Sequence, residues 1–71
     1  MEEQKQITRW YSFGHGHKHK FREITLDVNI LVEITDVNPR QVMVDLFGDE
    51  WAFEYRELPQ MKYFPRGIMY I

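Results

Sequence analysis

The strongest constraint on the fold is an alternation of apolar and polar residues between positions 24 and 35. Period-two alternation is typical of a β-strand with one buried face and one solvated face. The run exceeds the usual strand of about five or six residues, so it predicts one long bent strand or two strands broken near Asp27–Asn29. The apolar members of the alternation are Ile24, Leu26, Val28, Ile30, Val32 and Ile34.

A short helix is predicted directly after this run. Either Asp36 or Asn38 can cap it, and Pro39 suits the first helical position because the backbone N–H there has no acceptor within the helix. Gly48 is expected to end the helix as a left-handed C-cap. A helix this short requires packing against the sheet for stability. Its apolar side is expected to consist of Val42, Met43, Leu46 and Phe47.

Three further segments complete the predicted fold. Residues 7–13 are rich in β-branched and aromatic side chains and end at Gly14, which indicates a first strand. Residues 51–55 alternate again, and residues 67–71 indicate a final short strand after a mostly irregular segment at 57–66. The predicted fold class is therefore α+β: a small antiparallel sheet of four or five strands with one short helix packed on it.

Large apolar side chains are frequent in the second half of the chain. Trp51, Phe53 and Tyr55 alternate on one strand and are expected in the core, with Tyr55 and Arg56 at the rim of a pocket as the alternative. A second group near the C-terminus is too large for the surface of so small a protein, so it is expected to complete the core or to form an oligomer interface. This second group consists of Tyr63, Phe64, Met69 and Tyr70.

Length and composition limit the class of protein. A chain of 71 residues makes a single domain, 1–71, of which residues 1–6 are expected to be frayed. The absence of cysteine excludes disulfides and thiolate metal sites. The sequence has neither a signal-peptide core nor a run approaching about 18 apolar residues, so we expect a cytoplasmic protein with no membrane partner.

The net charge of −2 conceals an uneven distribution of charge. Basic side chains outnumber acidic ones by five to two in residues 1–22, whereas acidic side chains outnumber basic ones by eight to one in residues 23–54. The estimated pI of about 5.8 argues against binding to generic duplex nucleic acid, which requires a more basic domain. The distribution favours a homo-oligomer or capture of a small anion by the basic segment.

The candidate ligand-binding site is the segment that runs from the first predicted strand into a basic loop. Its glycines allow backbone N–H groups to converge on an anion, its cationic side chains supply charge, and its aromatic rings can stack on a base. The pattern predicts a pocket for a phosphate-bearing nucleotide. The candidate residues are Trp10, Tyr11, Phe13, Gly14, His15, Gly16, His17, Lys18, Lys20 and Arg22.

Two other interpretations of this segment remain open. Trp10 and Phe13 can belong to the core while the glycine-, histidine- and lysine-rich tip of a hairpin is simply solvated. Alternatively, the loop can bind a partner protein directly. The sequence alone does not decide among a nucleotide, a protein partner and a solvated tip.

The three histidines of the chain, His15, His17 and His19, are weak candidates for a metal site. On an extended strand, residues four positions apart lie about 13 Å from each other, so the outer two could share an ion only if the loop curled. No histidine or cysteine follows later in the chain to complete the ligand set. We therefore expect no metal and no cofactor.

Catalysis has little support in the sequence. The chain contains no cysteine nucleophile, no G-x-S-x-G motif and no P-loop. Ser12 lies near the histidines, but a serine and a histidine without a third orienting group are a frequent coincidence. The expectation is a protein without enzymatic activity.

Two motifs together resemble small proteins encoded by tailed bacteriophages. Those proteins carry an aromatic-x-Phe-Gly-x-Gly-His start and a Phe-Gly-x-x-Trp-Ala-Phe-x-Tyr centre. This chain departs from them in the additional His15 and His19 and in a longer β-rich segment before the helix. The matching positions are Phe13, Gly14, Gly16, His17, Phe47, Gly48, Trp51, Phe53 and Tyr55.

The resemblance implies a bacteriophage origin and brings no known activity with it. By analogy, small non-catalytic phage proteins act in the cytoplasm of the host cell, in counter-defence or host takeover. They do so by sequestering a nucleotide signal or by blocking a host protein. We therefore expect a binding protein whose partner is a small phosphate-bearing ligand or, alternatively, a host protein.

Overall fold

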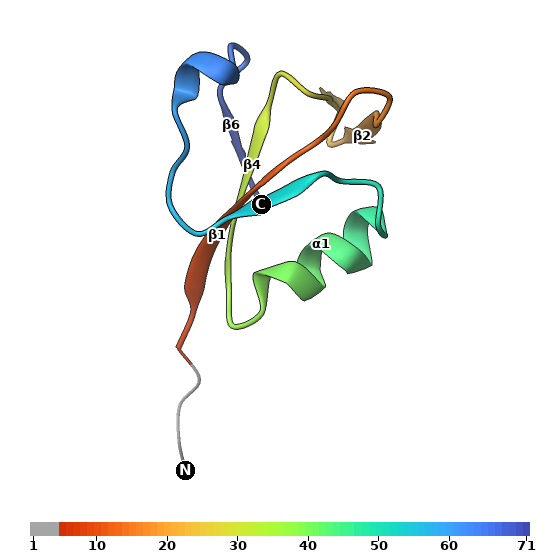
Figure 1. The fold of residues 1–71 in the computed structure, drawn as a ribbon. Helices are drawn as coiled ribbons and strands as arrows, with labels where there is room; N and C mark the ends of the chain where they lie inside the picture. The colour runs from red at the N-terminus through yellow and green to blue at the C-terminus, as the bar shows by residue number, and fades with distance from the viewer. Residues whose placement is uncertain (1–4) are drawn as a thin grey trace.

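The computed structural model describes residues 5–71, which form a small α+β fold with two sheets and one α-helix (Figure 1). This confirms the predicted fold class. Of the segment expected to be frayed, residues 1–4 lie outside the described residues, and Lys5 and Gln6 precede the first strand without regular structure. The elements are β1 (Ile7–Ser12), β2 (His19–Phe21), β3 (Ile24–Leu26), β4 (Leu31–Asp36), α1 (Pro39–Phe47), β5 (Phe53–Tyr55), the 3₁₀-helix η1 (Met61–Tyr63) and β6 (Ile68–Tyr70).

The larger sheet has four strands in the order β5-β1-β4-β6. Strand β1 is antiparallel to both of its neighbours, but β6 is parallel to β4, so the sheet is mixed rather than wholly antiparallel. Strands β5 and β6 run in the same direction at opposite edges of the sheet. Parallel strands require a long crossover of about a dozen residues, and the segment 56–67, which contains η1, supplies it.

The two faces of this sheet are covered differently. Helix α1 packs on the face that carries Tyr11 and Val32, where Met43 and Phe47 join the core. The crossover segment passes on the other side of the strands (Figure 1). We call this second side, which carries no α-helix, the helix-free face.

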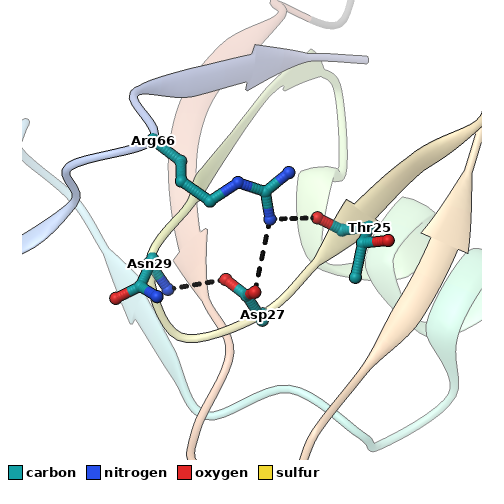
Figure 2. Close-up of polar contacts among 4 residues, drawn as sticks. All are labelled: Thr25, Asp27, Asn29 and Arg66. Atoms are coloured by element: carbon teal, nitrogen blue, oxygen red, sulfur yellow. Dashed lines mark hydrogen bonds and ion pairs between the residues drawn. The ribbon is translucent and has the colours of Figure 1, made fainter.

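The long alternating run forms two strands, β3 and β4, which confirms the second of the two predicted possibilities. The chain turns between them because the Asp27 carboxylate accepts a hydrogen bond of 2.9 Å from the Asn29 backbone N–H. The Arg66 guanidinium lies 3.3 Å from the Asp27 carboxylate and donates to the Thr25 carbonyl (Figure 2). Through Arg66, the crossover segment therefore stabilises the turn that separates β3 from β4.

Strand β3 pairs with β2 in a separate two-stranded sheet, which the sequence did not predict. The hairpin turn consists of Arg22 and Glu23, with φ angles of +52° and +69°. Two consecutive residues with positive φ form the primed type of turn that suits the twist of a hairpin, although such turns usually contain Asn or Gly. Phe21 and Leu26 of this hairpin pack toward the core.

The helix begins after Asn38, which is the cap, and ends before Gly48, as predicted, although Gly48 has a ψ of −128° rather than a left-handed helical value. The Asn38 side chain accepts a hydrogen bond of 3.3 Å from the Gln41 N–H, and Pro39 occupies the first turn. Gly48, with φ of +66°, follows the last turn and donates its N–H to the Val44 carbonyl at 2.8 Å. The predicted apolar side is wrong at Leu46, which is 42% exposed because the buried stripe is Pro39, Met43 and Phe47.

The hydrophobic core gathers side chains from β1, β3, β4, α1 and β6. Tyr11 and Phe13 belong to it, and so do Phe64 and Met69 of the C-terminal group, whereas Tyr70 is exposed. Within the described residues, no helix is long and apolar enough to cross a membrane. The buried hydrophobic residues are Tyr11, Phe13, Leu26, Ile30, Leu31, Val32, Ile34, Met43, Phe47, Phe64 and Met69.

Candidate functional site

The basic residues predicted to hold phosphate lie in and next to the β2–β3 hairpin, which we call the basic hairpin. Lys18, Lys20 and Arg22 are all exposed. Lys20 belongs to β2, where alternation directs it away from the core, whereas Lys18 precedes the strand and Arg22 lies in the turn. His19 and Phe21, at the intervening positions, face inward, and the Arg22 guanidinium lies 5.0 Å from the centre of the Phe21 ring.

The aromatic rings predicted to stack on a base are occupied in other ways. Tyr11 and Phe13 are core residues, with Phe13 only 1% exposed. Trp10 is half-buried on the helix-free face and donates its indole N–H to the Glu33 carboxylate at 2.8 Å. The interpretation of Trp10 and Phe13 as structural residues therefore fits the structure better than a stacking role.

Tyr11 is also held by a specific polar contact. Its hydroxyl donates a hydrogen bond of 2.7 Å to the Glu54 carboxylate on β5. Burial of the ring, the hydrogen bond and the negative charge of Glu54 together raise the pKa of Tyr11 well above its ordinary value. Tyr11 therefore remains protonated and serves to join β1 to β5.

The glycine-containing loop forms a tight turn. The His17 N–H donates to the Gly14 carbonyl at 3.1 Å, which closes the turn around His15 and Gly16. Gly16 has a φ of +86°, a conformation that other residues rarely adopt. Because the His17 N–H is used inside the turn, it is not directed at an anion.

The three histidines do not converge. His15 is exposed at the turn and His17 is half-buried, whereas the His19 ring packs 5.6 Å from Phe13 and 5.3 Å from Phe47. The His19 Nε2 atom lies 3.4 Å from the Glu50 carboxylate. Within residues 5–71, no group of three or more His, Asp or Glu side chains is placed to hold a metal ion. His19 thus packs at the margin of the core, with 22% of its side chain exposed.

A pocket of about 320 Å³ lies on the helix-free face between the end of β1, strand β5 and η1. Its walls are mostly apolar, and the lining residues with polar side chains are Ser12, His15, Tyr55 and Tyr63. Pockets that bind ligands typically begin at roughly this size. We call it the aromatic pocket; it is lined by Ser12, Phe13, Gly14, His15, Val28, Ala52, Phe53, Tyr55, Tyr63 and Phe64.

Two aromatic side chains of the pocket are exposed to solvent. Phe53 is 65% exposed and Tyr63 is 63% exposed. Tyr55 lies between them and the core, 6.4 Å from Phe53 and 6.5 Å from Phe64 by ring centres. The Lys62 ammonium lies 5.2 Å from the centre of the Tyr63 ring, so a cation accompanies this exposed aromatic group.

The expectation that Trp51, Phe53 and Tyr55 share one buried face is wrong. Phe53 pairs with Ser12 and Tyr55 with Trp10, which places both rings on the helix-free face. Trp51 precedes β5, so strand alternation does not apply to it, and its ring packs edge-on against Tyr11 at 5.2 Å. The alternative placed Tyr55 and Arg56 at the edge of a pocket; Tyr55 lines the aromatic pocket, whereas Arg56 is not among its lining residues.

Only Phe13, Gly14 and His15 of the predicted site line the aromatic pocket. Of the other lining residues, Tyr55 was expected at the edge of a pocket as an alternative, and the excess of large apolar groups near the C-terminus was a signal for Tyr63 and Phe64. No pattern in the sequence assigned the rest to a pocket. Comparisons with known proteins identify no relative: no protein family, no curated protein and no solved structure matches the chain.

Proposed function

We propose that this protein is a non-catalytic binding protein that captures an apolar side chain of a partner protein in the aromatic pocket. The observation that carries the proposal is the exposure of Phe53 and Tyr63, at 65% and 63%, on either side of an apolar hollow. Full burial of one such side chain is worth about 1.5–3 kcal/mol, so covering both rings provides a substantial driving force for association.

A protein partner fits the chemistry of the pocket better than a nucleotide does. None of Lys18, Lys20 and Arg22 lines the pocket, so the three cationic side chains predicted to hold phosphate are not among its walls. Exposed Phe and Tyr side chains around a mostly apolar hollow are typical of the centre of a protein–protein interface. The second of the two expected partners, a host protein, is therefore the one that we propose.

A phosphate-bearing nucleotide remains the second candidate because of one specific arrangement. Lys62 accompanies the exposed Tyr63 ring, and His15 contributes an imidazole to the same pocket. A base could stack on Tyr63 while these two groups meet a phosphate. In this alternative the charge comes from Lys62 and His15 rather than from the basic hairpin.

The biological setting that we propose follows from the resemblance to tailed-bacteriophage proteins. A small binding protein of a phage would act in the cytoplasm of its host, in counter-defence or host takeover, by blocking a host protein. We also propose that the protein can form a homo-oligomer, because the exposed rings of one copy could cover those of another.

The proposal is tested by NMR titration of the isotope-labelled protein with two probes, N-acetyl-phenylalaninamide and guanosine monophosphate. The first probe is expected to produce saturable shifts at Ala52, Phe53 and Tyr63. In the F53S variant its affinity is expected to fall by about tenfold, because one wall of the pocket is lost. The control is V44S, which removes an apolar side chain of similar exposure on α1.

Each outcome decides between the candidates. Pocket shifts with the phenylalanine derivative alone support capture of a side chain. Saturable shifts with the nucleotide alone, lost on Lys62→Ala, would replace the proposal by the nucleotide alternative. Binding of neither probe, or equal binding to the F53S variant and the wild-type protein, would overturn the proposed function.

A further inference from the structure

Strand β5 forms an edge of the larger sheet next to the aromatic pocket. Within residues 5–71 it pairs only with β1, so its outer side carries backbone N–H and C=O groups without a partner strand. An exposed edge of this kind can accept an extended peptide as an additional strand. The other edge strand, β6, contributes no residue to the pocket.

The side chains of β5 divide between the two faces of the sheet. Phe53 and Tyr55 point to the helix-free face and line the pocket, whereas Glu54, which pairs with Tyr11, points to the face of α1. Glu54 is exposed, and one of its oxygens accepts the Tyr11 hydroxyl. Within the described part of the chain no Lys, Arg or His forms an ion pair with it. The centre of the edge therefore carries a carboxylate without an ion-pair partner in this part of the chain, although Arg9 and Arg40 act electrostatically on the adjacent Tyr11 hydroxyl.

We infer that the partner protein binds by adding an extended segment of the pattern apolar–basic–apolar to the outer edge of β5. This inference rests on the proposed function and specifies the chemistry of the partner. The two apolar side chains of the segment lie beside Phe53 and Tyr55 at the aromatic pocket. The basic side chain between them lies opposite Glu54, where unlike charges on neighbouring strands attract.

The same charge argues against a second copy of this chain as the occupant. In a symmetric antiparallel pair of β5 strands centred on Glu54, the two Glu54 carboxylates would lie directly opposite each other. Like charges in that position destabilise strand pairing. Charge complementarity thus selects a basic partner segment over self-association at this edge.

The test compares two synthetic peptides, Thr-Phe-Lys-Phe-Thr and Thr-Phe-Glu-Phe-Thr, both blocked at their ends. Their dissociation constants are measured by NMR titration at low ionic strength. The wild-type protein is expected to bind the lysine peptide about fivefold more tightly than the glutamate peptide. Methylation of the backbone nitrogens of the lysine peptide is expected to abolish binding, because strand addition needs these N–H groups.

Two variants show whether Glu54 causes the preference. Glu54→Gln removes the charge and retains an oxygen that can accept the Tyr11 hydroxyl, so the two peptides are expected to bind equally. Asp49→Asn makes the same change at an exposed carboxylate that follows α1 and lies outside β5, and it is expected to keep the fivefold preference.

Failure of the inference is distinct from failure of the proposed function. In one outcome, the wild-type protein binds both peptides equally, and F53S alone among the variants weakens that binding. This result would overturn strand addition opposite Glu54 and leave the pocket as the binding site. Absence of binding of the lysine peptide at about 1 mM would also overturn it. A dimer of the wild-type protein that dissociates on F53S would overturn it in favour of a second copy.

Discussion

The Tyr11 hydroxyl donates a hydrogen bond of 2.7 Å to the Glu54 carboxylate, and it thereby joins a fully buried ring to an exposed residue of the edge strand. The two residues are paired in the register of β1 and β5. Since neighbours along a strand face opposite sides, this contact on the α1 face places Phe53 and Tyr55 on the other face. The aromatic pocket therefore depends on the register that Tyr11 and Glu54 stabilise.

Replacing Tyr11 by phenylalanine tests the strength of this contact. The Y11F variant retains the packing of the ring and loses the hydrogen bond, so its free energy of unfolding is expected to fall by about 1 kcal/mol. Urea denaturation measures the change. The exposed variant Y70F serves as the control and is expected to leave stability unchanged. Equal stability of Y11F and the wild-type protein would show that the hydrogen bond contributes nothing.

The raised pKa of Tyr11 predicts a loss of stability at alkaline pH. Burial and Glu54 raise the pKa of Tyr11 in the folded protein above the ordinary value of 10.0, which applies to the unfolded chain. Above about pH 10 the unfolded chain loses this proton while the folded protein keeps it, so the free energy of unfolding falls as pH rises. Below that pH the contribution is fully present.

Chemical denaturation at a series of alkaline pH values measures this dependence. The free energy of unfolding of the wild-type protein is expected to decline more steeply above pH 10 than that of Y11F, which lacks the ionisable group. Parallel curves for the two proteins would contradict the assignment of the alkaline transition to Tyr11.

Arg66 is expected to stabilise the turn between β3 and β4. Its guanidinium lies 3.3 Å from the Asp27 carboxylate, but both side chains are partly exposed, so solvent screens the pair. Arg66→Met retains an apolar stem and is expected to cost about 1 kcal/mol, mainly through the lost contacts to Asp27 and the Thr25 carbonyl (Figure 2).

Hydrogen exchange locates this effect. The amide of Ile30 donates to the Asp27 carbonyl at 3.3 Å. In Arg66→Met this amide is expected to exchange faster by more than the loss of global stability explains. The amides of α1 are expected to change only as much as the global stability changes. A uniform change throughout the protein, with no additional effect at Ile30, would contradict a local role for Arg66.

The hairpin turn offers a stabilising substitution. Glu23 has a φ of +69°, a left-handed conformation that costs a residue with a side chain about 1 kcal/mol and that glycine adopts freely. Glu23→Gly is therefore expected to raise the melting temperature by a few degrees, as seen by circular dichroism. Glu23→Ala is the control, since it removes the same carboxylate without relieving the backbone. A decrease of the melting temperature in Glu23→Gly would contradict the assignment of backbone strain to Glu23.

Local patterns in the sequence predicted the parts of the fold that depend on neighbouring residues. The cap at Asn38, the proline after it and Gly48 determine the ends of α1, and alternation places Val32 and Ile34 in the core. The parallel position of β6 was not predictable in this way, because the path of the crossover depends on contacts between distant segments, such as that of Arg66 with Asp27.

The candidate site was only partly predictable for the same reason. The aromatic pocket combines the end of β1, strand β5 and η1, three segments that are separated in the sequence. The motif around Gly14 marks one wall of it, but the exposure of Phe53 follows from its pairing with Ser12, which no local pattern reveals. The many aromatic residues indicated that aromatic side chains would bury a large area. Composition alone could not show which rings belong to the core and which to the surface.

The most direct test of the account is the measurement of intermolecular nuclear Overhauser effects between N-acetyl-phenylalaninamide and the protein. The account predicts contacts from the ring of this probe to the side chains of Phe53 and Tyr63, and none to the basic hairpin. Contacts confined to the surface of Lys18, Lys20 and Arg22, or the absence of any contact at saturating probe, would contradict the aromatic pocket as the binding site.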